Sequence, residues 1–213
     1  MANALKDIYE NHHKDLNKSG FSIMKEIRGK LISDYIGEGK DVLDIGCRDG
    51  TLTSFFVKNN RVTGADIDLN SLEAAKNKLG IETVFMDLNG DWQELGEKRF
   101  DAVVAGEVLE HLYYPDRVVE KIKKLLKPEG IFIGTVPNAF SFKNRIRYLL
   151  GQKRFTPLAD PTHINQFGLN DLREVLKKNF GSVDITGLGK YARLSKAFPS
   201  LVAFILMFIC KNK

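Results

Sequence analysis

Five short apolar runs follow one another from Asp41 onward, and segments of helical periodicity separate them. Each run is rich in β-branched residues and closes on Gly, Asp or Pro, as the strands of a buried parallel sheet do. Helical periods lie between them at Ser71–Leu79 and, more clearly, at Pro115–Leu126. The alternation predicts an α/β fold with a doubly wound, mostly parallel sheet. The runs are VLDI (42–45), VTGAD (62–66), TVFM (83–86), AVVAG (102–106) and IFIGTV (131–136).

The chain on either side of this alternation departs from it. Residues 5–36 look like two amphipathic helices with a break near residues 18–20. Residues 138–169 form a long insertion in which basic and aromatic residues interleave, and a helix is expected at Asn170–Asn179. No helical crossover is visible between two last strands near 182–187 and 201–209, so we expect that pair to be antiparallel.

Size and composition fit one globular domain. The chain has 213 residues, of which 43% are hydrophobic and 28% charged, enough to bury a substantial core. The polar N-terminus predicts no secretory signal, and Leu201–Cys210 is about half the length that a membrane-spanning helix needs. Two cysteines far apart, Cys47 and Cys210, predict a reduced, cytoplasmic protein. The net charge of +5 favours an anionic substrate, a membrane surface or RNA, but requires none of them.

The first strand runs directly into a turn with two glycines, VLDIGCRDGTLT (42–53). Ligands of open α/β sheets bind at the carboxyl ends of strands where the strand order reverses, and this turn would lie there. Gly46 lets the backbone pass close to a ligand, and Gly50 lets the next helix pack closely on the strand. The spacing is not the G-x-G-x-x-G of a dinucleotide site. The carboxylates of Asp44 and Asp49 also suit a cationic ligand better than a pyrophosphate.

Two further carboxylates follow the next two strands. Asp66 lies twenty residues beyond Gly46, where an acid can accept hydrogen bonds from both hydroxyls of a ribose. Asp87 can accept from an exocyclic amine while Leu88 packs on a flat ring. Asp66 and Asp68 could each cap the following helix instead. In this order, the groups describe a pocket for an adenosine.

Four segments in this order resemble the motifs of the class I S-adenosylmethionine-dependent methyltransferases, over about residues 40–190: VLDIGCRDGTLT, GADID, FMDLN and FDAVVAGEVLEHL. The first motif of that family reads Asp/Glu-x-Gly-x-Gly-x-Gly, and Arg48 stands where the family has its middle glycine. The resemblance implies that Asp44 lies near the cofactor ammonium or orders the loop, that Asp66 holds the ribose and Asp87 the adenine. The other cofactor positions that it implies are Gly46, Cys47, Gly50, Ile67, Leu88 and Gly106.

Arg48 is the departure from the family motif. A positive φ would cost an arginine about 1 kcal/mol or more, so we expect a slightly altered loop. Its side chain would point to solvent or reach the cofactor carboxylate. The departure also leaves open a chain that binds the cofactor weakly.

The segment GEVLEHL, after the fourth strand, carries candidate catalytic residues. If Glu107–His111 is helical, Glu107, Glu110 and His111 share one face, and such a cluster can bind a divalent metal or act as a general base. With His163, the set is similar to that of the ubiquinone-pathway O-methyltransferases and the RNA 3′-terminal ribose methyltransferases, where such residues are implicated in holding a divalent cation. Carried over, the four would be metal ligands, with Mg²⁺ the leading candidate. The alternative is that the histidines line the pocket or act as bases.

We therefore expect a single methyltransferase domain with a seven-stranded sheet and an antiparallel C-terminal strand pair. The expected function is methyl transfer to a small-molecule or lipid acceptor, at oxygen. An RNA-directed ribose methyltransferase is one alternative, supported by the pI of about 9.1 and the basic insertion, and a non-catalytic cofactor-binding protein is another. The expected parts are N-terminal helices (1–39), a cofactor-binding core (40–137), a substrate lid (138–169) and a C-terminal helix with the strand pair (170–213).

The lid is where the acceptor should be recognised. Its arginines and lysines alternate with aromatic and aliphatic residues, as at Arg145, Arg147 and Arg154. Such a segment can bind a lipid with an anionic head, a phosphorylated glycan or a nucleic acid, or it can simply cover the core. Nucleic acid is the less favoured partner because no RNA-binding module is appended. Peripheral membrane contact stays open, and the oligomeric state is not predicted.

Overall fold

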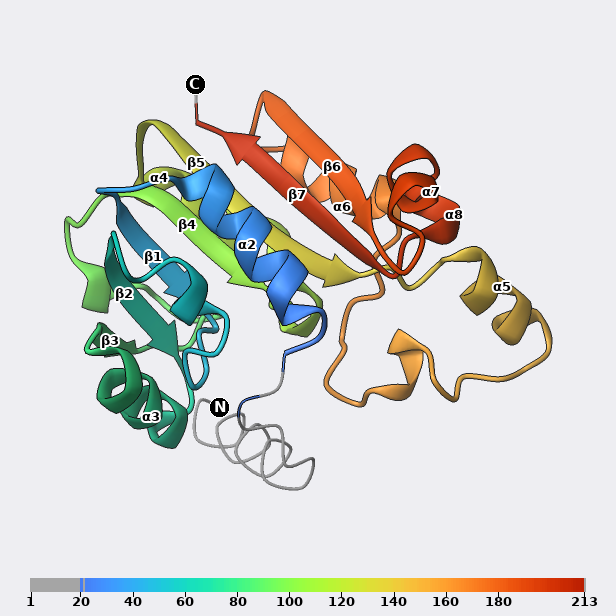
Figure 1. Ribbon diagram of the computed structural model, residues 1–213, viewed down its shortest axis with the longest axis horizontal. Coiled ribbons are helices and arrows are strands. Elements are labelled where there is room, and N and C mark those ends of the chain that lie inside the picture. Colours follow the sequence, from blue (N-terminus) through green and yellow to red (C-terminus); the bar gives the residue numbers. More distant parts are fainter. Residues whose placement is uncertain (1–19, 21, 213) are drawn as a thin grey trace. The chain divides into compact units, whose positions relative to one another are not determined.

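The computed structural model describes residue 20 and residues 22–212, which fall into two compact units (Figure 1). The first unit extends to Gly106 and the second begins at Glu107. In the part of the chain that is described, no helix is long and apolar enough to cross a membrane. The first of the two helices expected in residues 5–36 lies outside the described residues.

The first unit holds a parallel four-stranded sheet in the order β3-β2-β1-β4. β1 pairs in parallel with both β2 and β4, so Asp44 lies opposite Gly64 on one side and Val104 on the other. The strand order reverses at β1, which makes its carboxyl end a ligand-binding position. The elements are α2 (Lys25–Ile36), β1 (Asp41–Ile45), η1 (Thr53–Phe55), β2 (Arg61–Asp66), α3 (Leu69–Leu79), β3 (Glu82–Phe85), η2 (Gln93–Leu95) and β4 (Phe100–Gly106).

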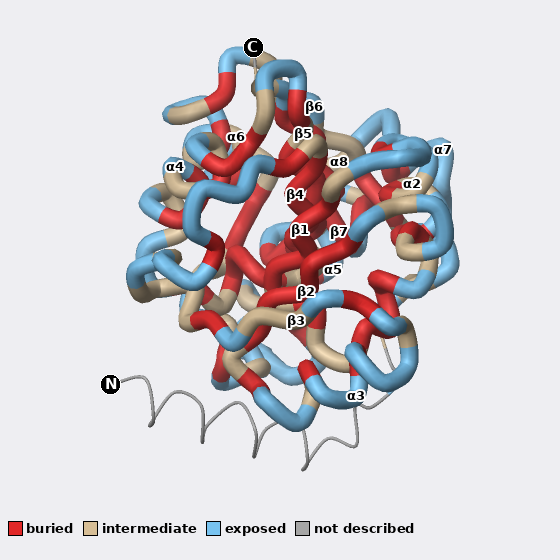
Figure 2. The backbone as a smooth tube through the Cα atoms, turned by 90° about the vertical axis from the view of Figure 1, so that its left-hand side faces the viewer, coloured by how far each residue is buried: buried red, intermediate tan, exposed pale blue. Residues whose placement is uncertain are grey.

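Burial in this unit follows the apolar runs of the sequence. Val42, Leu43 and Ile45 of β1 are fully buried, as are most residues of β4, and these strands form the red centre of Figure 2. Asp68 caps the N-terminus of α3 with a side chain that accepts hydrogen bonds from two backbone amides, and Gly80 caps its C-terminus with a left-handed φ of 66°.

The second unit holds three strands in the order β5-β7-β6, and β7 is antiparallel to both neighbours. Residues 205–210 of β7 are all buried, because the strand lies between two others. The elements are η3 (Leu109–His111), α4 (Pro115–Leu125), β5 (Leu126–Pro137), α5 (Phe142–Leu149), η4 (Pro157–Ala159), α6 (Leu169–Lys177), β6 (Ser182–Leu188), α7 (Ala192–Ala197), α8 (Pro199–Val202) and β7 (Ile205–Lys211).

The predicted α/β class, with seven mostly parallel strands and an antiparallel C-terminal pair, is confirmed. Two expectations for the last strand pair were wrong. The last strand begins at Ile205 rather than Leu201, because Pro199 starts the short helix α8 within the same apolar run. The connection between β6 and β7 contains α7 and α8, although it was expected to lack helices.

Candidate active site

The turn after β1 is held by backbone hydrogen bonds to the neighbouring strand. The amides of Gly46 and Cys47 both donate to the carbonyl of Ala65, over 2.7 and 3.2 Å. Gly46 and Gly50 have φ values of 67° and 72°, in the region that favours glycine. A Cβ on Gly50 would also lie 2.5 Å from Cδ1 of Leu79, so only glycine lets α3 pack this closely. Gly50 therefore allows close packing, as the sequence predicted, and the approach of a ligand to Gly46 stays a prediction.

Arg48 adopts a left-handed conformation with φ of 50°. The prediction of an altered loop is therefore wrong, because the chain keeps positive φ at all three motif positions. This conformation directs the Arg48 amide to Oδ2 of Asp66, at 2.9 Å. The hydrogen bond links the glycine turn to the end of β2 and offsets part of the backbone strain.

The strain at Arg48 can be measured with two variants. We expect Arg48→Gly to be more stable than Arg48→Ala by about 1 kcal/mol, because glycine adopts a positive φ without strain. This gain exceeds the stability that glycine loses through its greater freedom in the unfolded chain. Both variants lose the same charged side chain, so their difference in urea unfolding isolates the backbone contribution. Equal stability would mean that the loop does not hold the left-handed conformation in solution.

Asp44 is a buried carboxyl near the end of β1, just before the glycine turn, with 2% of its surface exposed. Burial raises its pKa from the ordinary 3.8 to about 7; the hydrogen bond from Thr53 lowers the pKa, the Asp66 carboxylate raises it, and the Arg28 guanidinium lowers it. Oγ1 of Thr53 donates to Oδ2 over 2.7 Å, so Asp44 fastens η1 to β1. A carboxyl that titrates this close to neutral pH would ionise more readily beside a bound cation.

Asp68 rather than Asp66 caps α3, a choice that the sequence left open. Asp68 caps α3, since its Oδ1 accepts from the amides of Asn70 and Ser71 over 3.0 and 3.1 Å. Asp66 does not cap the helix. Its Oδ2 accepts from the amide of Arg48 and its Oδ1 from the amide of Asp68, over 2.9 and 3.0 Å. The two amides orient the Asp66 carboxylate at the carboxyl end of β2.

The adenine position would lie at the end of β3. Oδ1 of Asp87 accepts from the Asn89 amide over 2.9 Å, which closes a tight turn through Gly90. Asp87, Leu88 and Ile67 are all partly exposed, so one carboxylate and two apolar side chains are accessible at this end of the sheet. The adenine role of Asp87 stays a prediction.

Two candidates have packing roles in the structure. Cys47 is buried, a Cβ on Gly64 would lie 2.8 Å from its Sγ, and burial raises the pKa of this thiol well above its ordinary value. A Cβ on Gly106 would lie 2.5 Å from Cδ2 of Leu52, so this position needs glycine to pack. Their contact with a cofactor remains a prediction.

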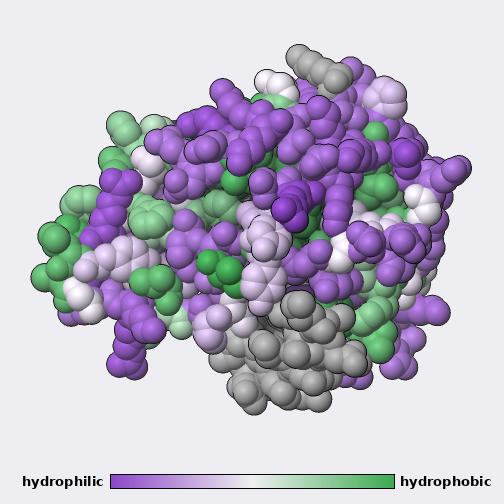
Figure 3. Space-filling view, turned by 180° about the vertical axis from the view of Figure 1, so that it is seen from behind, coloured by the Kyte–Doolittle hydropathy of each residue, from purple (hydrophilic) through white to green (hydrophobic). Residues whose placement is uncertain are grey.

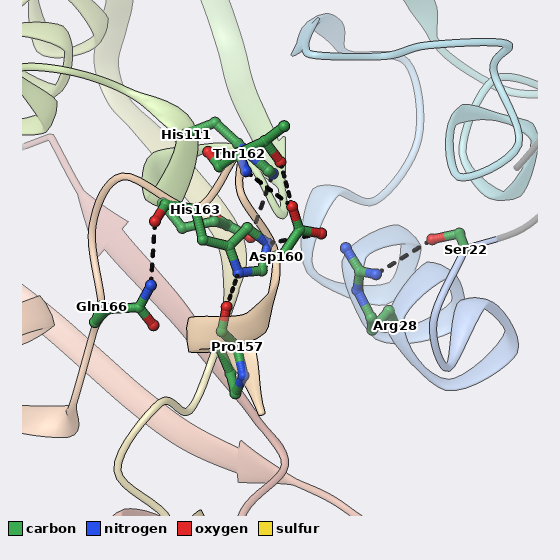
Figure 4. A network of polar contacts seen from close by, with 9 residues as sticks. Ser22, Arg28, His111, Pro157, Asp160, Thr162, His163 and Gln166 are labelled. Carbon is green, nitrogen blue, oxygen red and sulfur yellow. Dashed lines mark hydrogen bonds and ion pairs between the residues drawn. The ribbon is translucent and has the colours of Figure 1, made fainter. Parts of the chain in front are cut away.

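Sequence reasoning missed Arg28, which is 1% exposed on α2. Its Nη1 donates to Oγ of Ser22 over 3.2 Å (Figure 4). The same atom donates to the carbonyl of Ile23 over 3.0 Å. Its charge also acts on Asp44, as the effect on that pKa indicates. The signal was available, because Arg28, Ile32 and Ile36 recur at the four-residue spacing of one buried helix face.

In the second unit, Glu110, His111 and His163 come together although about fifty residues separate the histidines. Their ligand atoms all lie within 4.8 Å of one another, and Glu110 is buried. The amide of Asn165 donates to the carbonyl of Glu110 over 2.8 Å, and its side chain donates to the carbonyl of Leu112. These bonds fasten the His163 segment to η3 and bring the imidazole centroids to 4.8 Å.

Both imidazoles are oriented by main-chain carbonyls (Figure 4). Nδ1 of His111 lies 2.9 Å from the carbonyl of Thr162, and Nδ1 of His163 lies 3.1 Å from that of Pro157. A carbonyl only accepts, so each Nδ1 donates, and in the neutral ring the lone pair is on Nε2. The Nε2 atoms lie 4.0 Å from Oε1 of Glu110 and 3.9 Å from Oδ2 of Asp160. Each imidazole is thus arranged to accept a proton near a carboxylate.

Glu107 does not extend this cluster. It has φ of 63°, and the helical turn covers only Leu109–His111, so the predicted helix face through Glu107 is not formed. The cluster found among the described residues contains two imidazoles and one carboxylate. Mg²⁺ prefers six oxygen ligands, so this donor set does not fit it; imidazole-rich sets suit ions such as Zn²⁺.

Comparisons with known proteins agree with these features. The chain matches the family described as "Methyltransferase domain" over residues 21–181. It is 32% identical over 126 residues to the ubiquinone biosynthesis O-methyltransferase of Coxiella burnetii, covering 55% of this chain and 53% of that protein. It is 37% identical over 108 residues to the protein of the same name from Haemophilus ducreyi, covering 46% of each. The chain spans about half the length of these curated relatives.

Solved structures share the fold. A SAM-dependent methyltransferase from Archaeoglobus fulgidus aligns with a TM-score of 0.69 and 19% identity, over 95% of this chain and 99% of that one. The plantazolicin methyltransferase in complex with SAH aligns with a TM-score of 0.66 and 16% identity, over 98% and 90%. The family match over residues 21–181 includes the whole glycine turn and well over half of the sequence. The chain therefore belongs to the class I S-adenosylmethionine-dependent methyltransferases.

Proposed function

We propose that this chain, as one methyltransferase domain, transfers the methyl group of S-adenosylmethionine to an oxygen of a small-molecule or lipid acceptor. The supporting observation is the charge arrangement in the first unit. Buried Asp44 lies on β1 just before the glycine turn, the charge of buried Arg28 acts on it, and Asp66 is oriented at the end of β2. When bound, S-adenosylmethionine supplies an electrophilic methyl group on a positively charged sulfur.

The side chains present fit the cofactor. Its amino-acid end carries an ammonium and a carboxylate, which match Asp44 and Arg28 in charge. The carboxylate of Asp66 suits ribose hydroxyls, and the partly exposed Asp87 and Leu88 suit the amine and the face of adenine. Glycine at positions 46 and 50 has no side chain, so a ligand could approach the backbone closely at this turn.

On the acceptor side, we assign the proton-accepting role to His111, with His163 beside it. An attacking hydroxyl must lose its proton, and the Nε2 lone pair of an imidazole fixed through Nδ1 can accept it. The carboxylates near the two Nε2 atoms would stabilise the charged rings. Oxygen as the methylated atom is supported by two relatives that are O-methyltransferases, of which the chain spans about half the length. Two buried free cysteines support a cytoplasmic setting.

Calorimetry with S-adenosylhomocysteine tests the cofactor assignment. We expect stoichiometric binding to the native chain and an affinity about 10 to 100 times lower for Asp66→Asn, because a charged hydrogen-bond acceptor is lost. Asp68→Asn is the matched control, since Asp68 caps α3 and asparagine caps equally well. Absent binding to the native chain, or equal losses in both variants, would refute the assignment.

A further inference from the structure

Exposed apolar side chains gather on one part of the second unit. Of the twenty large hydrophobic side chains that are exposed among the described residues, seven lie in residues 138–158 and five in 189–204. Leu149, Phe155 and Leu150 are 83%, 73% and 66% exposed. Single exposed leucines are ordinary, but a dense group of this kind marks an interaction site. We name residues 138–158 and 189–204 the α5–α8 surface.

Helices α5 and α7 expose apolar side chains and bury a polar one, whereas a helix that covers a core does the reverse. In α5, Phe142, Ile146 and Leu149 follow helical spacing and are exposed, while the polar Asn144 is 8% exposed. In α7, Leu194 is 51% exposed and Ser195 is fully buried. Two helices thus bury a polar side chain and present apolar ones to solvent, which costs free energy unless another surface covers them.

The two segments are fixed to one another. Helix α5 packs against α8, which packs against α7 (Figure 1). The buried side-chain amide of Asn138 donates to the carbonyls of Pro199, Ser200 and Ala203, over 2.9 to 3.3 Å. The apolar side chains are therefore presented by an ordered framework.

Phe155 is presented by a strained backbone between two arginines. It has φ of 62°, and Nη1 of Arg147 donates to its carbonyl over 2.8 Å. The guanidinium of Arg154 lies 4.8 Å from the centroid of its ring. A bulky residue with positive φ and a largely exposed ring indicates a position held for contact with something outside the chain.

The charge of the surface is of one sign. Residues 138–158 contain five lysines and arginines, residues 189–204 contain three, and neither segment contains an aspartate or glutamate. None of these eight cations forms an ion pair with any other described residue. In Figure 3, green and purple side chains alternate along the left-hand edge, the side on which α5 lies when Figure 1 is turned round.

We propose that the α5–α8 surface docks on the interface of a lipid bilayer that contains anionic lipids. Phenylalanine and leucine side chains enter the boundary between headgroups and acyl chains, and the surrounding lysines and arginines attract the anionic headgroups. RNA would favour aromatic stacking platforms, whereas half of the twelve exposed apolar side chains on this surface are leucine or isoleucine. The absence of acids also disfavours a second copy of the same surface, because the cations would face one another. The inference goes beyond the proposed function and needs neither cofactor nor turnover.

Vesicle flotation with the full chain tests this docking. We expect the protein to float with vesicles of phosphatidylcholine mixed with phosphatidylglycerol, and much less with pure phosphatidylcholine. Leu149→Asn with Leu150→Asn should lower the partition coefficient about tenfold or more through lost apolar insertion. Lys153→Glu with Arg154→Glu should lower it at least about tenfold on anionic vesicles and weaken its dependence on salt, because six of the eight cations remain.

Matched variants in the first unit separate docking from general effects. Ile27→Asn with Leu69→Asn removes exposed apolar side chains, and Lys30→Glu with Lys58→Glu reverses exposed charges, so both should bind vesicles as the native chain does. Unchanged thermal unfolding and S-adenosylhomocysteine binding would show that the surface variants are folded. Three results would overturn the proposal: no preference for anionic vesicles, binding to single-stranded RNA but not to vesicles, or a dimer dissolved by Leu149→Asn with Leu150→Asn while vesicles stay unbound.

Discussion

Asp44→Asn should remove a pH dependence from the stability of the protein. The pKa of this carboxyl is about 7 in the folded chain against an ordinary 3.8, so the folded state binds the proton more tightly. Its stabilising contribution is therefore complete below pH 3.8, declines as the pH rises and is lost above about 7. As the pH rises from 5 to 8, the free energy of unfolding of the native chain should fall by about 2 to 3 kcal/mol relative to that of Asp44→Asn. Urea unfolding at both pH values measures this difference.

Asp49→Asn is the control for this prediction. Asp49 lies in the same turn, and although burial alone would raise its pKa, hydrogen bonds from Thr51 and the Gly20 amide lower it. Its contribution to stability is present above the ordinary pKa of 3.8 and declines as the pH falls, so asparagine should bring no gain at pH 8. A gain of the same size in both variants would contradict the assignment to Asp44.

The same carboxyl should couple cofactor binding to pH. Under the proposed function, the cofactor ammonium needs the ionised form of Asp44, so affinity for S-adenosylmethionine should rise from pH 6 to pH 8 in the native chain. The asparagine variant should bind about 10 to 100 times more weakly at pH 8 and lose the pH dependence. Calorimetry at both pH values measures this. The buried acid would then weaken the empty fold while serving the bound state.

His111→Asn should lower the turnover number about 100 to 10,000 times while leaving S-adenosylhomocysteine affinity unchanged. Asparagine can still donate to the carbonyl of Thr162, but it has no lone pair in place of Nε2. Formation of S-adenosylhomocysteine with a panel of phenolic acceptors gives the rate.

A metal role for the same histidines predicts different results. His163→Asn is the paired variant, because its amide can likewise replace the donor to the carbonyl of Pro157. If the histidines were ligands, both variants and EDTA treatment would abolish turnover, and Zn²⁺ would restore only the treated native chain. The proposed base role requires native activity to persist in EDTA. Both variants should bind S-adenosylhomocysteine as tightly as the native chain. Loss of turnover then reports on the base or metal role of the histidines and not on failure to bind the cofactor.

Much of the fold could be predicted because its signals are local. A run of β-branched residues forms a strand over nearly the residues expected, as at Arg61–Asp66 and Phe100–Gly106. The error at Leu201 arose where periodicity carries no information, since a short apolar run suits one helical turn as well as a strand. The prediction that Glu107 shares a helix face with His111 was wrong for a different reason. Glu107 has a positive φ directly after β4, so the helical turn begins only beyond it.

By itself, the sequence determined the order of strands and helices, the glycines of the turn and the acids at the ends of β1, β2 and β3. These properties depend on neighbouring residues and on local backbone preference. Only the tertiary structure decided that Asp44 titrates near neutral pH, that Arg28 is buried, that His111 meets His163 and that α5 turns its apolar side outward. Burial of a side chain depends on which distant segments exclude water from it, and the meeting of the two histidines depends on closing a loop of about fifty residues. Neither can be read from the spacing of residues along the chain.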